Sequence, residues 1–370
     1  MKICVLTGVY PPDSGGPARF ATTFPGWVEK NSLNKIEVLS FTNKKDSTFQ
    51  NLSIKINLIS RQTFLPIRIK KTVSKILKIA HEDTIFIANG MFLEILISKF
   101  LRQRISYVAK VPGDVVWERS KNKGRTSLNM RQFQNHKLNW RDRVNREIFT
   151  LSLKKAEKII VPSMELFYIL QEWGINSDKI AFVGNAANEQ HFRIIDSRQD
   201  IDILCVSRLV SWKNIDEVIK VAKSLDKNIT IAGEGEEKLN LIKLAEQLDV
   251  NAKFVGNVDY QELPKLYNRA VLYVLNSDYE GMPYSLIEAQ LCGVFSIANG
   301  NTGSSEVIIN GVSGRLTNSS EFKELLNAVS VYFQNEIGKF DRERIHNLAK
   351  ERFGYETNFR KILDVIEALE

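Results

Sequence analysis

The chain has 370 residues, of which 44% are hydrophobic and 25% are charged, a composition ordinary for a soluble globular protein. Three cysteines in apolar surroundings and four scattered histidines argue against a disulfide framework and against a zinc or iron centre. No apolar run approaches the roughly 20 residues of a membrane-spanning helix, and the run at residues 1–6 is too short for a signal peptide. We therefore expect a cytoplasmic protein without a metal or other cofactor, long enough for two domains.

The net charge of +8 is unevenly distributed along the chain. Residues 61–160 hold 22 Lys and Arg but only 8 Asp and Glu. A basic surface of this size attracts anionic partners. Nucleic acid, the anionic inner leaflet of the plasma membrane and a lipid-linked phosphate acceptor all fit the charge.

An apolar run, a polar loop and an amphipathic helix follow one another repeatedly in both halves of the chain. Apolar runs without alternation indicate strands buried on both faces, in parallel sheets covered by helices. The expected strands are 2–7, 36–41, 84–88, 106–110 and 158–161 in the first half, and 201–207, 229–232, 252–255, 271–275 and 293–298 in the second. This order predicts an α/β protein of two Rossmann-like, doubly wound domains.

The boundary between the domains is expected near residues 184–201, where Asn, Gln, Arg and Asp replace apolar residues. Residues 1–185 then form the first domain and 186–354 the second. Amphipathic helices are expected in the second domain, for example at 236–248 and 321–333, and a last helix from Tyr355 to Leu369.

Two glycines, Gly15 and Gly16, come soon after the first strand and before a helix that starts near Pro17. Glycines at such a point let the backbone approach a phosphate, with N–H groups of the helix start beside it. A tight turn without a ligand explains them equally well. The spacing is not that of a dinucleotide-binding loop.

Acidic and basic groups follow the strand at 106–110. Asp114 and Glu118 lie where they can contact a sugar or accept a proton from an acceptor hydroxyl, although Asp114 can equally cap the next helical turn. The run 119–146 is rich in Lys, Arg and Asn, with Phe133 and Trp140 within it and Trp117 just before it. Nucleic acid and a membrane interface both fit, but we favour a solvated face with core aromatics.

Two cations follow the first strand of the second half. Arg208 and Lys213 lie at its carboxyl end, where open parallel sheets bind ligands, and together can hold a diphosphate without a metal. The nearby Gly233 and Gly235 are interpreted as a turn. Asp200 and Asp202 open the strand at its amino end, so we reject this pair as a metal site.

The stretch 278–293 organises the second half. Glu280 lies on the loop after the strand at 271–275, and Pro283 suits the start of a helix that ends near Gly293. Glu288 lies on that helix, roughly 7.5 Å along its axis from Pro283. Two carboxylates flanking a helix N-terminus suit hydroxyl pairs at the ends of a ligand and diphosphate in its middle, so we infer a nucleotide sugar.

These motifs together resemble glycosyltransferase family 4, whose members have the GT-B fold of two Rossmann-like domains facing a central cleft. The resemblance covers nearly the whole chain. It rests on the E-x7-E pattern of Glu280 and Glu288, on Ser207-Arg208-Leu209 with Lys213, and on Tyr10-Pro11-Pro12 with Gly15-Gly16. Weaker matches are Phe254-Val-Gly256, Thr302-Gly303 with Glu306, and Gly311 with Gly314.

The resemblance implies a retaining enzyme that usually needs no metal. Arg208 and Lys213 would neutralise the departing diphosphate, Glu288 would bind the ribose and Glu280 the donor sugar. Further donor contacts would come from Gly15 or Gly16, from the region of Gly256 and Val258 near the base, and from the backbone of Gly281, Met282, Pro283 and Tyr284. The helix at 355–370 would pack on the first, acceptor-binding domain, and residues 186–354 would bind the donor.

The chain departs from the family at two places. Met282-Pro283 replaces a common Phe-Gly, and Pro112-Gly113-Asp114 occupies a region where many members have a histidine. We expect Glu280, Arg208, Lys213 and Asp114 to act in catalysis, with a glycan or lipid-linked acceptor and contact with an anionic membrane. The alternatives are an epimerase of the same shape and a nucleic-acid-binding protein, although no nucleic-acid partner is expected.

Overall fold

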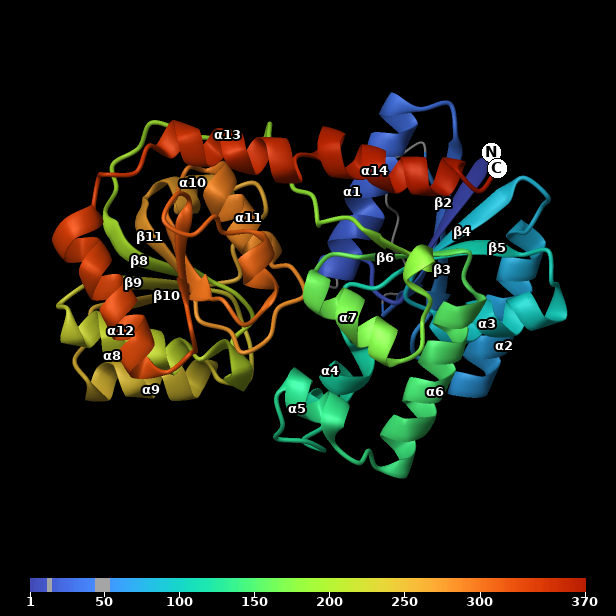
Figure 1. Ribbon diagram of the computed structural model, residues 1–370, viewed down its shortest axis with the longest axis horizontal. Coiled ribbons are helices and arrows are strands. Elements are labelled where there is room, and N and C mark those ends of the chain that lie inside the picture. Colours follow the sequence, from blue (N-terminus) through green and yellow to red (C-terminus); the bar gives the residue numbers. More distant parts are fainter. Residues whose placement is uncertain (12–14, 44–53) are drawn as a thin grey trace. The chain divides into compact units, whose positions relative to one another are not determined.

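The computed structural model describes residues 1–11, 15–43 and 54–370, and these divide into two compact units. The first unit comprises Met1–Val183 and Phe359–Glu370, and the second comprises Gly184–Asn358. Figure 1 shows a parallel sheet with helices around it in each unit. Within the described residues, one sheet has seven strands and the other has six.

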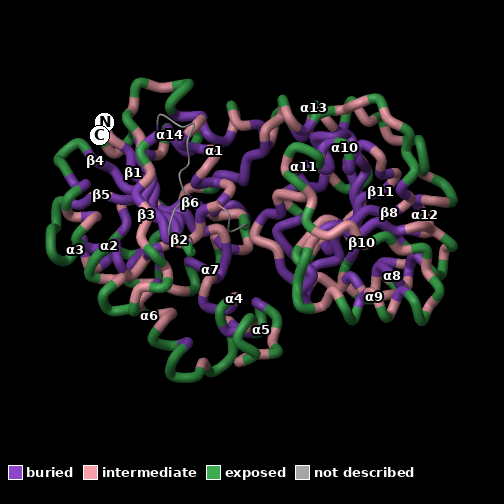
Figure 2. The backbone as a smooth tube through the Cα atoms, turned by 180° about the vertical axis from the view of Figure 1, so that it is seen from behind, coloured by how far each residue is buried: buried purple, intermediate pink, exposed green. Residues whose placement is uncertain are grey.

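The first sheet has the strand order β3-β2-β1-β4-β5-β6-β7, with every neighbouring pair parallel. Its central strands are buried because helices cover both faces (Figure 2). The strands are β1 (Lys2–Thr7), β2 (Lys35–Thr42), β3 (Lys55–Ser60), β4 (Thr84–Asn89), β5 (Ser106–Lys110), β6 (Lys158–Val161) and β7 (Ile180–Phe182).

The helices of the first unit follow its strands in the expected alternation. They are α1 (Gly16–Asn31), α2 (Leu65–Ile79), α3 (Phe92–Leu101), α4 (Val115–Asn122), α5 (Met130–Asn135), α6 (Trp140–Lys155), α7 (Met164–Glu172) and the short η1 (Ser177–Lys179). The last helix, α14 (Tyr355–Glu367), contributes its residues from Phe359 onward to this unit. Phe359 packs edge-on against Phe24 and Trp27 of α1, at centroid distances of 5.3 and 5.9 Å.

The second sheet has the order β10-β9-β8-β11-β12-β13, again parallel throughout. Its strands are β8 (Ile201–Val206), β9 (Ile229–Ala232), β10 (Ala252–Gly256), β11 (Ala270–Leu275), β12 (Ser296–Asn299) and β13 (Gly314–Thr317). Its helices are η2 (Ser211–Lys213), α8 (Ile215–Ser224), α9 (Lys238–Gln247), α10 (Leu263–Asn268), α11 (Tyr284–Leu291), η3 (Gly303–Glu306), α12 (Phe322–Val331), the π-helical η4 (Tyr332–Glu336) and α13 (Arg342–Phe353).

The strand predicted at 293–298 begins three residues later in the structure, at Ser296. Gly293 takes a φ of 71° and its N–H donates to the Gln290 carbonyl, while the Val294 N–H donates to Ala289. These bonds end helix α11, so pairing with β11 starts only at Ser296. The strands β3, β7 and β13 were not predicted.

Candidate functional site

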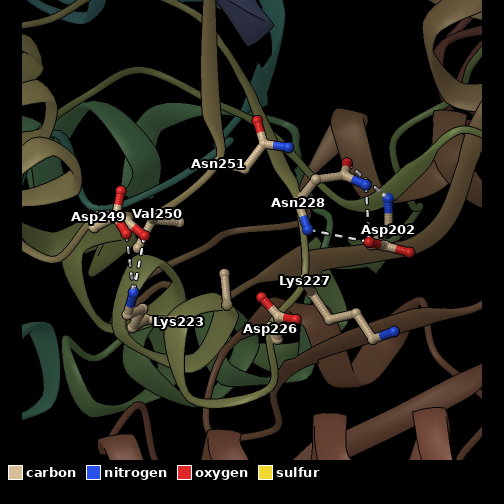
Figure 3. A pocket seen from close by; sticks show the side chains of 9 residues that line it. Asp202, Lys223, Asp226, Lys227, Asn228, Asp249, Val250 and Asn251 are labelled. Atoms are coloured by element: carbon tan, nitrogen blue, oxygen red, sulfur yellow. Dashed lines mark hydrogen bonds and ion pairs between the residues drawn. The ribbon is translucent and has the colours of Figure 1, made fainter.

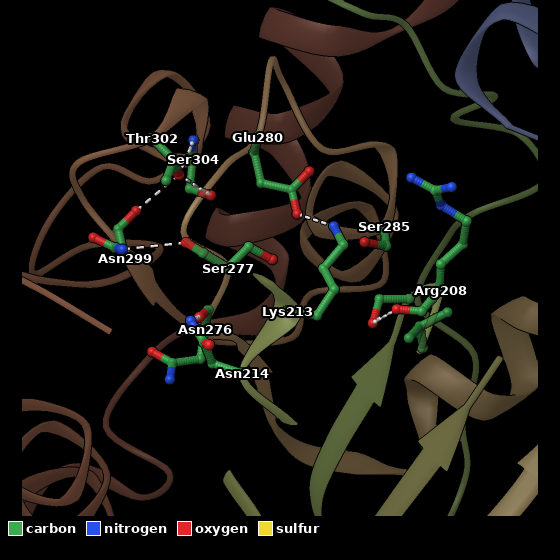
Figure 4. A network of polar contacts seen from close by, with 12 residues as sticks. Arg208, Lys213, Asn214, Asn276, Ser277, Glu280, Ser285, Asn299, Thr302 and Ser304 are labelled. Carbon is green, nitrogen blue, oxygen red and sulfur yellow. Dashed lines mark hydrogen bonds and ion pairs between the residues drawn. The ribbon is translucent and has the colours of Figure 1, made fainter. Parts of the chain in front are cut away.

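Three candidate residues of the second unit, Arg208, Lys213 and Glu280, gather at the carboxyl edge of its sheet (Figure 4). All strands are parallel, so the loops after them leave from the same edge. Arg208 follows β8, Glu280 follows β11, and α11 begins just beyond Glu280. This is the edge at which open α/β sheets bind ligands.

Direct contacts join the loop after β8 to the loop after β11. The Asp278 N–H donates to the Trp212 carbonyl at 2.9 Å, and the Asn214 amide donates to the Asn276 carbonyl at 3.1 Å. Between them, Lys213 and Glu280 form an ion pair in which each side chain is only 12% exposed. The candidate residues Lys213 and Glu280 are therefore in direct contact in the structure.

Arg208 is exposed, and its guanidinium lies 5.7 Å from the centroid of the Trp212 ring. The loop that carries it packs against the turn at 233–235, where the Leu209 N–H donates to the Glu234 carbonyl at 3.0 Å. A Cβ atom on Gly233 or Gly235 would overlap backbone atoms of this loop. These two glycines therefore serve close packing beside Arg208, as a turn.

The loop bearing Glu280 is held from two sides. The Gly303 N–H donates to the Glu280 carbonyl at 2.8 Å, and a Cβ atom on Gly303 would overlap the Gly281 carbonyl. On the other side, the Asn185 amide donates to the Met282 carbonyl at 2.8 Å. The Met282 side chain is buried in the apolar core, so this departure from the family pattern fills the interior.

Helix α11 presents its N-terminus at the same edge. Pro283, expected as the first helical residue, is instead the N-cap, and no side chain among the described residues caps the helix start. Ser285, in the first turn, accepts a hydrogen bond from the buried Tyr273 hydroxyl at 2.8 Å. Uncapped N–H groups and the helix dipole make this start suitable for an anion such as phosphate.

Glu288 has a different environment from Glu280. It is 2% exposed, and its Oε2 accepts a hydrogen bond from the Tyr267 hydroxyl of α10 at 2.9 Å. Sequence reasoning did not identify Tyr267, because 21 residues separate the two partners and no local pattern links them. Tyr267 fixes the orientation of the Glu288 carboxylate.

The region expected to flank a base also lies at this edge. Gly256 ends β10 with a φ of 67°, and its carbonyl accepts the Gly233 N–H at 2.7 Å. Val258, two residues later, is half-buried against the core. Both positions stay candidates on location alone.

The first unit holds the remaining candidates. Gly15 is the N-cap of α1 with a φ of 136°, a conformation that favours glycine, and Gly16 is the first residue of the helix. Pro12, part of the motif quoted for this loop, lies outside the described residues, as do 13 and 14. The proposed contact of Gly16 with a donor stays a prediction.

Asp114 is a helix cap in this structure. It is 1% exposed, and its Oδ1 accepts the N–H groups of Val116 and Trp117 at 2.9 and 3.1 Å. Its Oδ2 accepts from the Gln134 amide at 2.8 Å and lies 3.6 Å from the Arg146 guanidinium. The capping alternative is thus the one that the geometry supports, and we do not retain Asp114 as a catalytic residue.

Most of the aromatic residues in and beside the basic run 119–146 are buried in the core. Trp117 and Phe133 are 1% and 2% exposed, whereas Trp140 is 71% exposed. Arg146 lies between the rings of Phe133 and Trp173, at 5.2 and 4.9 Å from their centroids. Two of the three aromatics therefore belong to the core.

The rejected metal pair lies at the amino end of β8 in the second sheet, and Figure 3 shows Asp202 beside Asn228. Asp200 pairs with Arg269, and Asp202 accepts from the Asn228 backbone and amide at 3.0 and 2.8 Å. Across residues 1–11, 15–43 and 54–370, no group of three or more His, Cys, Asp or Glu is placed to hold a metal ion. Cys4, Cys205 and Cys292 are buried and unpaired by disulfides.

Sequence comparison relates this chain to known glycosyltransferases. Residues 187–352 match the family model for glycosyl transferases group 1, so the match covers most of the second unit. The chain is 24% identical over 243 residues to an uncharacterized glycosyltransferase of Methanocaldococcus jannaschii, covering 61% of this chain and 62% of that protein. It is 27% identical over 188 residues to the amylovoran biosynthesis glycosyltransferase AmsD of Erwinia amylovora, covering 45% and 52%.

Among solved structures, HepE of Anabaena, in complex with UDP and glucose, aligns over 100% of both chains with a TM-score of 0.79 and 18% identity. This likeness shows that the chain has the GT-B fold, as the sequence predicted. The chain spans less than two thirds of the length of the curated relatives described above. Their names agree on one class of protein, the glycosyltransferases.

Proposed function

We propose that this protein is a retaining, metal-independent glycosyltransferase that moves a hexose-type sugar from a nucleotide diphosphate sugar to a glycan or lipid-linked acceptor. One observation carries the proposal. Lys213 and Glu280 meet beside the uncapped start of α11, on the edge that also bears Arg208, within the residues that match the family model. The cationic groups and the helix N-terminus can bind the diphosphate of such a donor, and the carboxylate can bind its sugar hydroxyls.

In this proposal the positive groups stabilise the leaving group. When the bond from the anomeric carbon to the diphosphate breaks, negative charge develops on the departing oxygen. Arg208, Lys213 and the N–H groups at the start of α11 stabilise that charge as it forms, which is why we propose no metal. Glu280 accepts hydrogen bonds from the sugar hydroxyls, and Glu288, oriented by Tyr267, accepts from the ribose.

The acceptor belongs to cell-surface polysaccharide or glycolipid assembly in this proposal. The relative named for amylovoran biosynthesis supports that assignment. We place the protein in the cytoplasm, since its three cysteines are free thiols. The excess of Lys and Arg in residues 61–160 supports a position at the anionic inner face of the plasma membrane. The epimerase alternative has no support among the names of the relatives, and we do not retain it.

A donor panel tests the proposal. A ligand that binds only the folded state raises the unfolding temperature, so UDP-, GDP- and ADP-sugars are compared by thermal shift. One donor is expected to stabilise the protein and to be hydrolysed or transferred slowly. Glu280→Ala and Arg208→Ala are expected to lower turnover by about a hundredfold each. Unchanged turnover in both variants would refute the assigned roles, and binding of nucleic acid without any donor affinity would favour the remaining alternative.

A further inference from the structure

Helix α2 of the first unit carries basic residues and no acidic ones. Its 15 residues include Arg68, Lys70, Lys71, Lys75 and Lys78. Lys70, Lys71 and Lys78 are exposed, whereas Arg68 and Lys75 are partly buried. The helix therefore presents a cationic outer face.

Apolar side chains lie beside this cationic face. Phe64, Leu65 and Ile67, at the start of α2, are 71%, 53% and 50% exposed. Phe100 and Leu101, at the end of α3, are 58% and 66% exposed. Exposure of several large apolar side chains on neighbouring elements marks an interaction surface more often than chance.

A groove between α2 and α3 lies beside these apolar residues, and Leu101 lines it. Helices α2 and α3 pack side by side (Figure 1). Its α2 wall uses residues three or four apart, which lie on one side of a helix. It is lined by Pro66, Ile69, Lys70, Val73, Ser74, Leu77 and Lys78 of α2 and by Ile97 and Leu101 of α3.

Most of the negative charge near this face is neutralised or buried, while Asp83 of the loop after α2 is exposed. Glu94, the one acidic residue of α3, is 7% exposed. Glu82, in the loop after α2, pairs with Arg104 at 2.9 Å. The face therefore fits an anionic partner that also accepts aliphatic and aromatic side chains.

We propose that the α2–α3 face docks on a bilayer that contains anionic lipids. The ammonium groups of lysines at the margin of an apolar surface can reach lipid phosphates while their methylene groups pack against that apolar surface. Phe64, Leu65, Ile67, Phe100 and Leu101 enter the headgroup–acyl boundary, as on interfacial amphipathic helices. Nucleic acid is less well matched, because it is bound by cations with stacking aromatics and this face is mainly aliphatic. The proposal does not depend on the glycosyltransferase assignment.

The test is sedimentation of the full chain with vesicles of phosphatidylglycerol and phosphatidylcholine, compared with pure phosphatidylcholine. The Lys70→Glu/Lys71→Glu/Lys78→Glu variant is expected to lower the partition coefficient by about a hundredfold or more, and Ile67→Ser/Leu101→Ser by about tenfold. Matched controls in the second unit are Lys243→Glu/Lys253→Glu/Lys323→Glu and Leu239→Ser, all at exposed positions. The controls are expected to bind vesicles like the unaltered protein, and unfolding temperatures show that every variant is folded.

Several outcomes would overturn the proposal. Absence of binding to the anionic vesicles is one. Equal losses in the second-unit controls would show that net charge acts without a specific face. Binding that the lysine variant abolishes and Ile67→Ser/Leu101→Ser leaves intact would rule out apolar insertion, and preference for a single-stranded oligonucleotide over vesicles would assign the face to nucleic acid.

Discussion

Lys213 and Glu280 are each other's counter-ion across two loops of the second sheet, and both are largely shielded from solvent. In the proposed function, Lys213 holds the donor diphosphate and Glu280 holds the sugar. A diphosphate that approaches Lys213 must therefore compete with the Glu280 carboxylate for the same ammonium group. Because of this competition, removing the Glu280 carboxylate is expected to affect nucleotide binding and turnover in opposite directions.

Glu280→Gln is expected to tighten the binding of a nucleoside diphosphate while it lowers transfer. Removing the carboxylate leaves the Lys213 charge available, and a gain of about 1 kcal/mol corresponds to about fivefold in affinity. Turnover should fall by about a hundredfold, because the sugar loses its carboxylate contact. Calorimetric titration with UDP and GDP, together with a transfer assay, measures both. Weaker nucleotide binding in Glu280→Gln would contradict the competition.

Gly303→Ala is expected to impair the donor loop without touching a proposed ligand-binding side chain. The added methyl group would overlap the backbone of Gly281, so the loop bearing Glu280 must move. A displacement of about 1 Å can cost about a hundredfold in rate. Gly26→Ala is the control, since a Cβ atom there meets open space within α1. Turnover of Gly303→Ala equal to that of the control would disprove the role of this contact.

Asp114→Asn distinguishes a cap from a catalytic base. Asparagine caps helices about as well as aspartate, but it cannot accept a proton as a carboxylate does. We expect kcat to stay within about twofold, while the unfolding temperature falls because the partly buried Arg146 loses one of its charge partners. Loss of kcat by a hundredfold, with the fold retained, would restore Asp114 as a catalytic residue.

Lys110 makes the stability of the first unit depend on pH. Burial lowers the pKa of Lys110 from 10.5 to about 8. Between pH 8 and 10.5 the unfolded chain holds a proton that the folded chain has released, so the free energy of unfolding rises with pH. Below pH 8 the folded state carries the full cost of burying the charge, on the order of 3 kcal/mol.

Lys110→Met is therefore expected to raise the unfolding temperature at pH 7 and to change it little near pH 10.5. The exposed Lys78→Met is the matched control and should show no such dependence on pH. Thermal unfolding at several pH values measures the difference. A Lys110→Met variant that is less stable than the unaltered protein at pH 7 would show that the ammonium group stabilises the fold.

The central strands of both sheets were predictable because burial on both faces requires continuous apolar runs. The runs at β1, β5 and β9 are examples, since their length and polarity specify a strand without knowledge of the neighbours. The strands β7 and β13 have only three and four residues at the edges of their sheets. Pairing with a neighbour, and not local sequence, defines such strands.

The candidate site was predictable where chain direction decides the geometry. Parallel strands bring Arg208, Lys213 and Glu280 to one edge whatever their separation in sequence. The environment of Glu288 was not predictable, because its partner Tyr267 lies on another helix and only packing brings the two together. The same holds for the backbone contact of Gly303 with the loop at Glu280.

The affinity of Arg208→Ala and Lys213→Met for UDP and GDP tests most directly whether this edge of the second sheet binds the diphosphate of a donor. Loss of either cation is expected to weaken the better-bound nucleotide by at least about tenfold, because charge-assisted bonds to phosphate contribute about 1.5–3 kcal/mol. Lys227→Met, at the opposite edge of the sheet, should bind as the unaltered protein does. If both Arg208→Ala and Lys213→Met bind UDP and GDP with unaltered affinity, the diphosphate does not bind here and the account is wrong.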